Sequence, residues 1–413
     1  MADIHLAAIV AGRQTGVLSQ VGGRTSFRYL QDYTGTPLSL SMPVTPGPYP
    51  SRRASSWIRG LLPDNRSVLA EWGAQLGVNP NNPVALLSRM GRDCPGAVQF
   101  CLPEEVDETL AGHGELIPLS ADQVAERVAT ARQDPAHWTY TGEQWSLAGA
   151  QTKFALRQVG GHWFEAHGAE PTTHIVKVGV PGYADHDANE HLCMAAAAKL
   201  GLRVAHTDYA DFAGERALIV TRFDRMAVGG KVVRIHQEDL CQALGLPPER
   251  KYQDMGGPGV AAITDLIKAA SSEASLWRFV EAQAYGYLIG ATDGHAKNYA
   301  MLLEGDRAEL APLFDIASVL PYDPANDNLS TSVAMSIGGE KRIGRVTEHH
   351  WARMANRAGV PPERLLARVR ELAHDLPDAL ADAIGEMTPT VSGELERRFT
   401  DRLPDHLKKL GVA

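Results

Sequence analysis

The chain has 413 residues, of which 44% are hydrophobic and 22% are charged. This length and composition predict a globular protein of two or three domains and exclude a fibrous or broadly disordered one. The formal net charge of −9 argues against a continuous basic surface that binds nucleic acid unaided, so association with DNA would need a partner.

The amino terminus and the cysteines bear on the compartment. Asp3 stands where a secretory signal has Lys or Arg, and the apolar run that follows is too short for a signal sequence. No later segment is long and uncharged enough to span a bilayer. Neither the fifteen His residues nor the four cysteines show the spacing of a structural transition-metal site or a disulfide framework. We therefore expect a protein of the reducing cytoplasm.

Residues 1 to about 110 are predicted to form a first unit. The Pro- and Gly-containing stretch 45–50 is expected to be a surface loop. The other elements expected in this unit are a turn at Gly22-Gly23, short strands over 26–30 and 37–43, and a helix over 54–62. A short helix and a connector are predicted to follow over 118–140.

The middle of the chain, 146–225, is predicted to consist of strands with one inserted helix. Gly160-Gly161 marks the turn of a hairpin over 153–166. In the next strand, 174–178, alternation places Lys177 within a β-branched run. A lysine there needs a partner, unless it lies on an edge strand and guards against aggregation.

A helix is predicted over 187–201, with an acidic start and Gly201 as its end. Glu190 is expected in its first turn. A strand lysine followed by a helix glutamate is the arrangement with which kinases fix the lysine that binds the α- and β-phosphates. The alternative for Glu190 is a favourable charge near the positive end of the helix dipole. Another hairpin is predicted over 209–221, around Gly214.

The remainder is predicted to be mainly helical. Asp293 and Asn298 lie five positions apart after an apolar helix, and a predicted hairpin separates them from Asp315. This order of helix, Asp/Asn loop, hairpin and Asp is how kinases assemble a magnesium site, although Asp, Gly and Asn also form ordinary turns. The helices are expected over 260–270, 276–289 and much of 348–410, and the hairpin over 299–311.

Several separate motifs in the same order resemble the HipA family, whose members are bacterial serine/threonine kinases that act as toxins of HipBA toxin-antitoxin modules. The resemblance covers nearly the whole chain. It is carried by Pro37-Leu-Ser-Leu-Ser-Met-Pro, Leu61-Leu-Pro-Asp-Asn-Arg, Ser146-Leu-Ala-Gly-Ala-Gln-Thr-Lys, Thr173-His-Ile-Val-Lys, Arg222-Phe-Asp-Arg, Gln237-Glu-Asp-Leu-Cys-Gln-Ala-Leu-Gly, Ala291-Thr-Asp-Gly-His-Ala-Lys-Asn and Phe314-Asp-Ile.

The resemblance implies an α+β, protein-kinase-like two-lobed fold with an added N-terminal α/β subdomain and a mainly α-helical C-terminal lobe. The expected domains are the N-terminal HipA-like subdomain (1–110), the nucleotide-binding N-lobe with its connector (111–225) and the helical C-lobe with the catalytic loop (226–413).

The resemblance also implies roles for individual residues. Asp293 would be the catalytic base, and Asn298 and Asp315 would hold Mg²⁺. Ser146 matches the autophosphorylated serine of the family, although an ordinary loop serine is the alternative. The catalytic loop would also contain His295 and Lys297, and ATP would be bound by Ser146, Leu147, Ala148, Gly149, Ala150, Gln151, Lys153, Lys177, Glu190, Thr221 and Phe223.

Two classes of function follow from this resemblance. The first is a kinase toxin, whose substrates in the family include aminoacyl-tRNA synthetases and whose partner is a HipB-like helix-turn-helix antitoxin. DNA would be reached only through the antitoxin, which would associate the complex with the nucleoid. The second is a weakly active or inactive corepressor with a kinase fold, which works with a DNA-binding antitoxin. A kinase acting on a small molecule or lipid is a third possibility, and no membrane association is expected.

Overall fold

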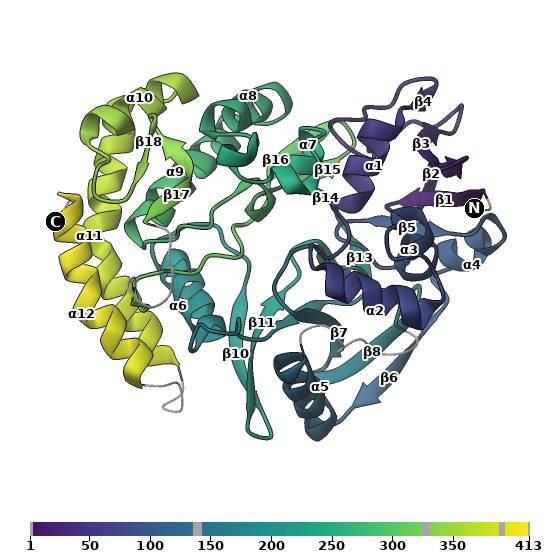
Figure 1. Ribbon diagram of the computed structural model, residues 1–413, viewed down its shortest axis with the longest axis horizontal. Helices are drawn as coiled ribbons and strands as arrows, with labels where there is room; N and C mark the ends of the chain where they lie inside the picture. Colours follow the sequence, from purple (N-terminus) through teal and green to yellow (C-terminus); the bar gives the residue numbers. More distant parts are fainter. Residues whose placement is uncertain (1–2, 135–142, 324–330, 388–392, 412–413) are drawn as a thin grey trace. The chain divides into compact units, whose positions relative to one another are not determined.

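Figure 1 shows the computed structural model, which describes residues 3–134, 143–323, 331–387 and 393–411. Strands and helices come in runs along the chain, and the strands of the N-terminal sheet pair antiparallel, which confirms the expected α+β class. The chain forms two compact units that each combine segments distant in sequence. The first comprises Met1–Val178, Ala210–Pro248 and Ala300–Ala308, and the second comprises Gly179–Tyr209, Glu249–Tyr299 and Glu309–Ala413. The boundaries expected at 110 and 225 stay a prediction.

The first unit begins with an antiparallel sheet in the order β4-β3-β2-β1-β5. Gly22 and Gly23 both have positive φ in the turn between β2 and β3, as the predicted turn requires. The strands are β1 (Ile4–Val10), β2 (Arg13–Val21), β3 (Arg24–Tyr29), β4 (Pro48–Tyr49) and β5 (Val98–Cys101), and the helices are α1 (Ser51–Arg59), α2 (Arg66–Leu76), α3 (Pro83–Met90) and α4 (Val106–Leu110).

Two predictions in this region are wrong. The stretch 37–43 is not a strand, because the backbone N–H groups of Ser41 and Met42 are bonded to the side chain and carbonyl of Ser39 in a turn. The stretch 45–50 is not wholly loop, because β4 pairs with β3 at its end. The predicted strand at 26–30 and helix at 54–62 exist as β3 and α1, with shifted ends.

A second sheet of the first unit has the strand order β10-β11-β9-β7-β8-β6. β9, which carries Lys177, lies between β11 and β7, and this excludes the edge-strand explanation of that lysine. The predicted hairpins are confirmed. The strands are β6 (Gly114–Leu119), β7 (Lys153–Val159), β8 (His162–Gly168), β9 (His174–Lys177), β10 (Thr207–Phe212) and β11 (Glu215–Thr221), with helix α5 (Ala121–Gln133) between β6 and β7 in sequence. Residues 135–140 of the predicted connector lie outside the described residues.

Shorter elements complete the first unit. A hairpin of β12 (Arg225–Val228) and β13 (Lys231–Arg234) precedes β14 (His236–Asp239) and the short helix α7 (Leu240–Ala243). β14 pairs with β15 (Ala300–Glu304), which continues into β16 (Arg307–Leu310), so the hairpin predicted over 299–311 is confirmed.

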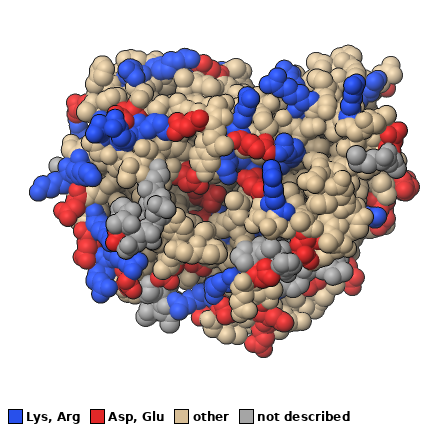
Figure 2. Space-filling model, in the orientation of Figure 1, with Lys and Arg blue, Asp and Glu red and all other residues tan. Residues whose placement is uncertain are grey.

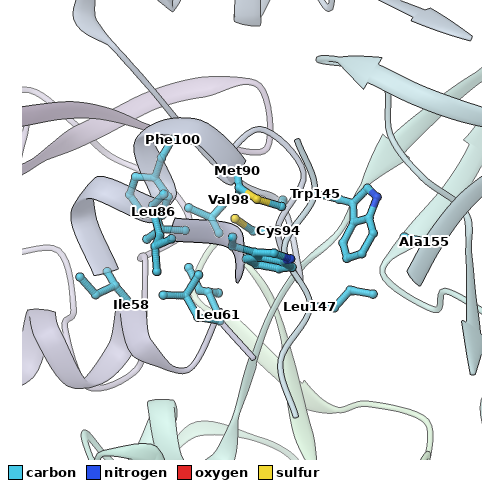
Figure 3. Close-up of a cluster of buried hydrophobic side chains, with 14 of the residues drawn as sticks. Ile58, Leu61, Leu86, Met90, Cys94, Val98, Phe100, Trp145, Leu147 and Ala155 are labelled. Atoms are coloured by element: carbon cyan, nitrogen blue, oxygen red, sulfur yellow. The ribbon is translucent and has the colours of Figure 1, made fainter. Parts of the chain in front are cut away.

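One hydrophobic core joins the two larger sheets of the first unit. Phe27 and Phe100 of the N-terminal sheet belong to the same cluster of buried residues as Phe154 and Val176 of the second sheet. Trp145 and Leu147 belong to this cluster as well, and Figure 3 shows them beside residues of α1, α3 and β5. The segment that contains Ser146 is therefore part of the core rather than a surface loop.

The second unit is mainly helical, as predicted. α8 matches its predicted range, and α9 gains an N-terminal turn because Ser272 caps it by accepting from Ser275 N–H. The helices are α6 (His186–Lys199), α8 (Val260–Ala270), α9 (Glu273–Leu288), α10 (Glu348–Ala358), α11 (Pro362–Glu386) and α12 (Gly393–Leu410), with a small hairpin of β17 (Ser332–Ile337) and β18 (Glu340–Arg342).

α6 confirms the predicted helix but corrects one detail. Because it begins at His186, Glu190 is its fifth residue, and the acidic residue of its first turn is Asp187. Glu190 is also buried, with 1% of its surface exposed. A solvated charge at the positive end of the dipole, the alternative considered for Glu190, does not describe this environment.

The surface agrees with the net charge of the sequence. Figure 2 shows Lys and Arg interspersed with Asp and Glu among the described residues of the visible face, so basic side chains form no continuous surface there. Within the described part of the chain, none of the helices has the length and apolar character needed to cross a membrane.

Candidate active site

The predicted catalytic loop follows α9 directly. The chain leaves the helix through Gly290, whose φ is +74° and where a Cβ would lie 3.0 Å from Leu320. Beyond it, His295 and Lys297 are buried, with 4% and 7% of their surfaces exposed, whereas the Asp293 side chain is 68% exposed. The Asp293 side chain therefore reaches the solvent, while the loop residues His295 and Lys297 are buried.

The side chain of Asn298 connects the loop to Asp315. Its Nδ2 donates to the carbonyl oxygen of Asp293 at 2.9 Å and faces that of Asp315 at 3.4 Å. Asp315 has a φ of +62°, a conformation that non-glycine residues rarely adopt and that is often found at functional sites. The structure thus brings together Asp293, Asn298 and Asp315, as expected from their order in the sequence.

The segment after Asp315 is tied to two helices of the same unit. Ser318 Oγ donates to the carbonyl of Ile289 at 2.5 Å, and Val319 N–H donates to Gly290 O at 3.0 Å. Asn189 of α6, which is fully buried, accepts from Ser318 N–H and donates to Ser318 O. The sequence analysis missed Asn189, although a polar residue on the buried face of a predicted helix is a signal that could have identified it.

Tyr252 is a second residue that the sequence analysis missed. Its hydroxyl donates to Asp293 Oδ1 at 2.7 Å, and its ring meets the His295 ring edge to face at 4.8 Å. Burial lowers the pKa of His295, while the nearby Asp293 opposes that shift. His295 is therefore favoured in its neutral form, although its Nε2 lies 4.0 Å from Asp293 Oδ2.

Asn298 and Asp315 offer oxygen ligands that fit a magnesium ion. Mg²⁺ prefers oxygen ligands and is usually bound by one or two carboxylates together with water and substrate phosphates. Because the Asn298 amide nitrogen donates to backbone carbonyls, its Oδ1 is the atom left for a cation. Among the described residues, no group of three or more His, Cys, Asp or Glu side chains lies together in a way that could hold a metal ion.

In the first unit, two lysines stand opposite each other. Lys153 of β7 and Lys177 of β9 are direct register partners on neighbouring antiparallel strands, so their side chains share a face. Like charges directly opposite each other on neighbouring strands are destabilising by themselves. The predicted alternation is confirmed, because Val176 and Val178 belong to the core on the opposite face.

The segment 146–151 forms a loop above Lys153. Lys153 Nζ donates to Ala148 O at 2.8 Å, and Gln151 Nε2 donates to Val178 O at 3.0 Å. Gly149 has a φ of +102°, and a Cβ there would lie 2.7 Å from Lys153 Nζ. The positive φ favours glycine at this point of the loop, while Ala150 is exposed.

Residues of the N-terminal part of the first unit hold this loop. Ser146 is fully buried, and its Oγ donates to Leu61 O at 2.5 Å. Ser146 N–H donates to Asp93 O, and Asp64 N–H donates to Gly149 O, each at 3.0 Å. The Trp145 ring packs edge to face on Trp72 of α2, with 6.1 Å between the ring centroids. The N-terminal part of the first unit therefore contacts this loop on both sides of Ser146.

A buried ionic network lies beneath the motif Arg222-Phe-Asp-Arg. Asp93 pairs with Arg225 at 2.8 Å and with Arg234 at 3.0 Å, and Asp224 pairs with Arg222 at 2.9 Å. Burial alone would raise the pKa of both Asp residues, but the neighbouring arginines hold the pKa of Asp224 at about 2 and that of Asp93 well below its usual range. The motif is therefore a structural support.

The remaining predicted residues have definite positions. Thr221 ends β11 and pairs with His174, and Phe223 follows it, half buried, on the chain that leaves the sheet. Leu147 belongs to the core of the first unit. Lys177 lies in the first unit and Glu190 in the second, so their expected interaction remains a prediction.

Comparisons with known proteins found matches to both the N-terminal part and the rest of the chain. The chain matches the models of the HipA N-terminal domain over residues 6–101 and the HipA-like C-terminal domain over residues 145–380. It is 33% identical over 392 residues to "Putative kinase Y4mE" of Sinorhizobium fredii, covering 92% of this chain and 91% of that protein. It is 29% identical over 411 residues to the "Serine/threonine-protein kinase toxin HipA" of Shewanella oneidensis, covering 94% and 90% of the two chains.

Similarity also extends to a solved structure. In the complex of HipA, HipB and operator DNA from the Shewanella oneidensis MR-1 toxin-antitoxin system, one chain superposes with a TM-score of 0.81. It is 27% identical in sequence, and the match covers 98% of this chain and 96% of that one.

Proposed function

This chain belongs to the HipA family, and on that premise we propose that it is an ATP- and Mg²⁺-dependent serine/threonine protein kinase that acts as a toxin. The observation that carries the proposal is the Asn298 side chain, which links the backbone of Asp293 to that of Asp315. This link supports a base and two oxygen ligands at one place, which is what phosphoryl transfer requires.

In the proposed reaction, Asp293 accepts the proton of the substrate hydroxyl as that oxygen attacks the γ-phosphorus. Asn298 and Asp315 would hold Mg²⁺, which would neutralise charge on the phosphate oxygens when bound. His295 and Lys297 line the catalytic loop from its buried side. The exposed position of Asp293 suits a base that must meet a protein substrate.

The first unit would bind ATP. Lys153 and Lys177 present two positive charges on one face of the sheet, and the loop from Leu147 to Gln151 lies above Lys153. We propose that these groups bind the phosphates and that Glu190 orients Lys177. Thr221 and Phe223 would contact adenine at the end of β11.

We propose that Ser146 is the site of inhibitory autophosphorylation. Because Ser146 is fully buried, its hydroxyl can reach a nucleotide only after the segment has left the core. A phosphate would add a charge of roughly −1.5 to −2, and the buried position between Trp145 and Leu147 could not accept it again. The modified loop would stay out, and the kinase would be inactive.

The proposed partners follow from the family. A HipB-like antitoxin would bind the chain in the cytoplasm and bring it to DNA and the nucleoid, and the substrate would be a bacterial protein such as an aminoacyl-tRNA synthetase. The second candidate is the weakly active corepressor. The negative net charge favours indirect over direct contact with DNA in both cases.

The test is intact-mass spectrometry with peptide mapping after the purified protein is incubated with ATP and Mg²⁺. We expect one phosphate on Ser146 in the parent and none in Asp293→Ala, which should still bind ATP in calorimetry. Ser146→Ala should lose the label. Ser56→Ala is the matched control, because Ser56 is also buried and its Oγ also donates to a backbone carbonyl.

Transfer at the parental rate by Asp293→Ala would refute the assignment of the base. Absence of phosphate in a parent that binds nucleotide and is purified without prior phosphate would favour the corepressor.

A further inference from the structure

A short, rigid segment beside the catalytic loop carries Tyr252. The carbonyl oxygen of Tyr252 accepts from Met255 N–H at 3.0 Å and from Gly257 N–H at 2.9 Å, which closes a tight turn. At Gly257 a Cβ would lie 2.1 Å from Arg250 O, so the turn depends on this glycine. The backbone that carries Tyr252 is therefore fixed by its own hydrogen bonds.

The same segment is bound on both sides to other parts of the second unit. Lys251 O accepts from Ala296 N–H of the catalytic loop at 3.2 Å. The Gln253 amide accepts from Ser336 N–H of β17 at 2.7 Å and donates to Ser336 Oγ at 3.2 Å. Tyr252 thus projects from a segment that is attached to the loop it contacts.

The contact itself is made with the predicted base. Tyr252 donates to Asp293 Oδ1 at 2.7 Å, an ordinary length for a charge-assisted O–H···O bond. Asp293 Oδ2 faces His295 Nε2 at 4.0 Å, which is too long for a hydrogen bond. Oδ1 is thereby occupied, while Oδ2 belongs to a side chain that is 68% exposed.

We propose that Tyr252 is a positioning residue for Asp293: its phenol fixes Oδ1, so that Oδ2 is presented to the acceptor hydroxyl. An exposed carboxylate without such a bond samples several rotamers, whereas a base must lie within about 3 Å of the proton that it accepts. The inference rests on the proposed kinase function. In the step itself the acceptor proton passes to Oδ2, the acceptor oxygen bonds to the γ-phosphorus and ADP leaves.

The test compares Tyr252→Phe with the parent. This variant keeps the ring that packs on His295 and removes only the hydroxyl. Time courses of Ser146 phosphorylation at several ATP concentrations, read by intact mass and peptide mapping, give a maximal rate and a half-saturating ATP concentration. Tyr33→Phe is the matched control, because its hydroxyl donates to Thr36 O at the same 2.7 Å. Melting temperatures establish that each variant is folded.

We expect the maximal rate of Tyr252→Phe to fall roughly ten- to hundred-fold, with the half-saturating ATP concentration within about two-fold of the parent. Tyr33→Phe should match the parent. In an Asp293→Glu background, where the carboxylate is already displaced, Tyr252→Phe should lower the rate by a smaller factor, because the two residues act through one contact.

Three results would overturn the inference while leaving the kinase proposal intact. They are an unchanged rate in Tyr252→Phe, equal losses in rate and ATP affinity that accompany a lower melting temperature, and a phosphate mapped on Tyr252, which would make this residue an acceptor. A parent that binds ATP but transfers no phosphate would overturn the kinase proposal and this inference with it.

Discussion

Two buried groups on β14 should change the free energy of unfolding of the first unit in opposite directions as the pH varies. Glu238 Oε1 accepts from Leu40 N–H at 2.7 Å and Oε2 accepts from Trp57 Nε1 at 3.0 Å. His236 Nε2 donates to Leu38 O at 3.0 Å, while its Nδ1 faces Ala97 N–H at 3.4 Å. Both side chains thus join β14 to the turn that the sequence analysis took for a strand.

Burial perturbs the two groups in opposite directions. It raises the pKa of Glu238 from 4.5 to about 7, against hydrogen bonds that lower it. It lowers the pKa of His236 from 6.5 to about 4, against a hydrogen bond to Leu38 that raises it. Each difference, at about 1.4 kcal/mol per pH unit, corresponds to roughly 3 kcal/mol in the free energy of unfolding.

The signs follow from proton binding. The folded state holds the Glu238 proton more tightly than the unfolded state, so this contribution is complete below pH 4.5 and is lost as the pH rises to about 7. The unfolded state holds the His236 proton more tightly, so that contribution is complete above pH 6.5 and is lost as the pH falls to about 4. In the parent the two changes largely cancel between pH 4.5 and 6.5.

Single substitutions should remove this cancellation. Compared with the parent, the free energy of unfolding of Glu238→Gln should rise by roughly 3 kcal/mol more as the pH increases from 4 to 6.5, because of these two groups only His236 still titrates. In His236→Gln it should fall by a similar amount between pH 4.5 and 7. Any constant loss from a disturbed hydrogen bond changes the level of each curve and leaves its slope intact.

Urea unfolding at several pH values, followed by tryptophan fluorescence, measures these slopes. Hydrogen exchange of peptides from β14 identifies the transition that belongs to the first unit. Parallel pH profiles of the parent and Glu238→Gln would refute the reasoning, since they would mean that Glu238 has the same pKa in the folded and unfolded states.

Two further predictions concern the loop and its support. Gly149→Ala should weaken ATP binding in calorimetry by at least about ten-fold, because it adds strain at positive φ and a contact with Lys153 Nζ. The control is Gly160→Ala, which is also at positive φ but has no neighbour within 4 Å of a Cβ, and which should bind ATP like the parent. Asp93→Asn should lower the free energy of unfolding by roughly 3 to 5 kcal/mol in a urea titration, because it leaves buried arginines uncompensated. The control is Asp265→Asn, in an exposed ion pair, which should lower the free energy of unfolding by less than about 1 kcal/mol in the same titration.

Local signals explain which parts of the fold could be predicted. The hairpin at Gly160-Gly161 and the helix ending before Gly201 are specified by residues close together in sequence, and both are present. The stretch 37–43 misled because its alternating apolar residues suggest a strand, whereas Ser39 bonds the backbone of its own segment and Glu238 bonds Leu40. The partner that decides the conformation is about 200 positions away, beyond any sequence window.

The candidate site shows the same division. Asp293, Asn298 and Asp315 could be found because their spacing follows the order of helix, loop and hairpin, and the Asn298 side chain does contact the backbone carbonyls of both aspartates. Tyr252 could not, since its contact with Asp293 spans 41 positions and depends on a turn that positions a phenol. The residues proposed to perform the chemistry are visible in a motif, while the residue proposed to orient them becomes visible only in the folded chain.

Burial of Ser146 connects the architecture with the proposed regulation. A serine that is to be phosphorylated would ordinarily be exposed, yet this one lies in the core and is held through Leu61 and Asp93, residues of the N-terminal part of the chain. The segment must therefore break these contacts before it can be modified, and the strength of the contacts sets how often it is released. Because Asp93 is itself fixed by the buried arginines, the N-terminal part would control how long the kinase stays active before it silences itself.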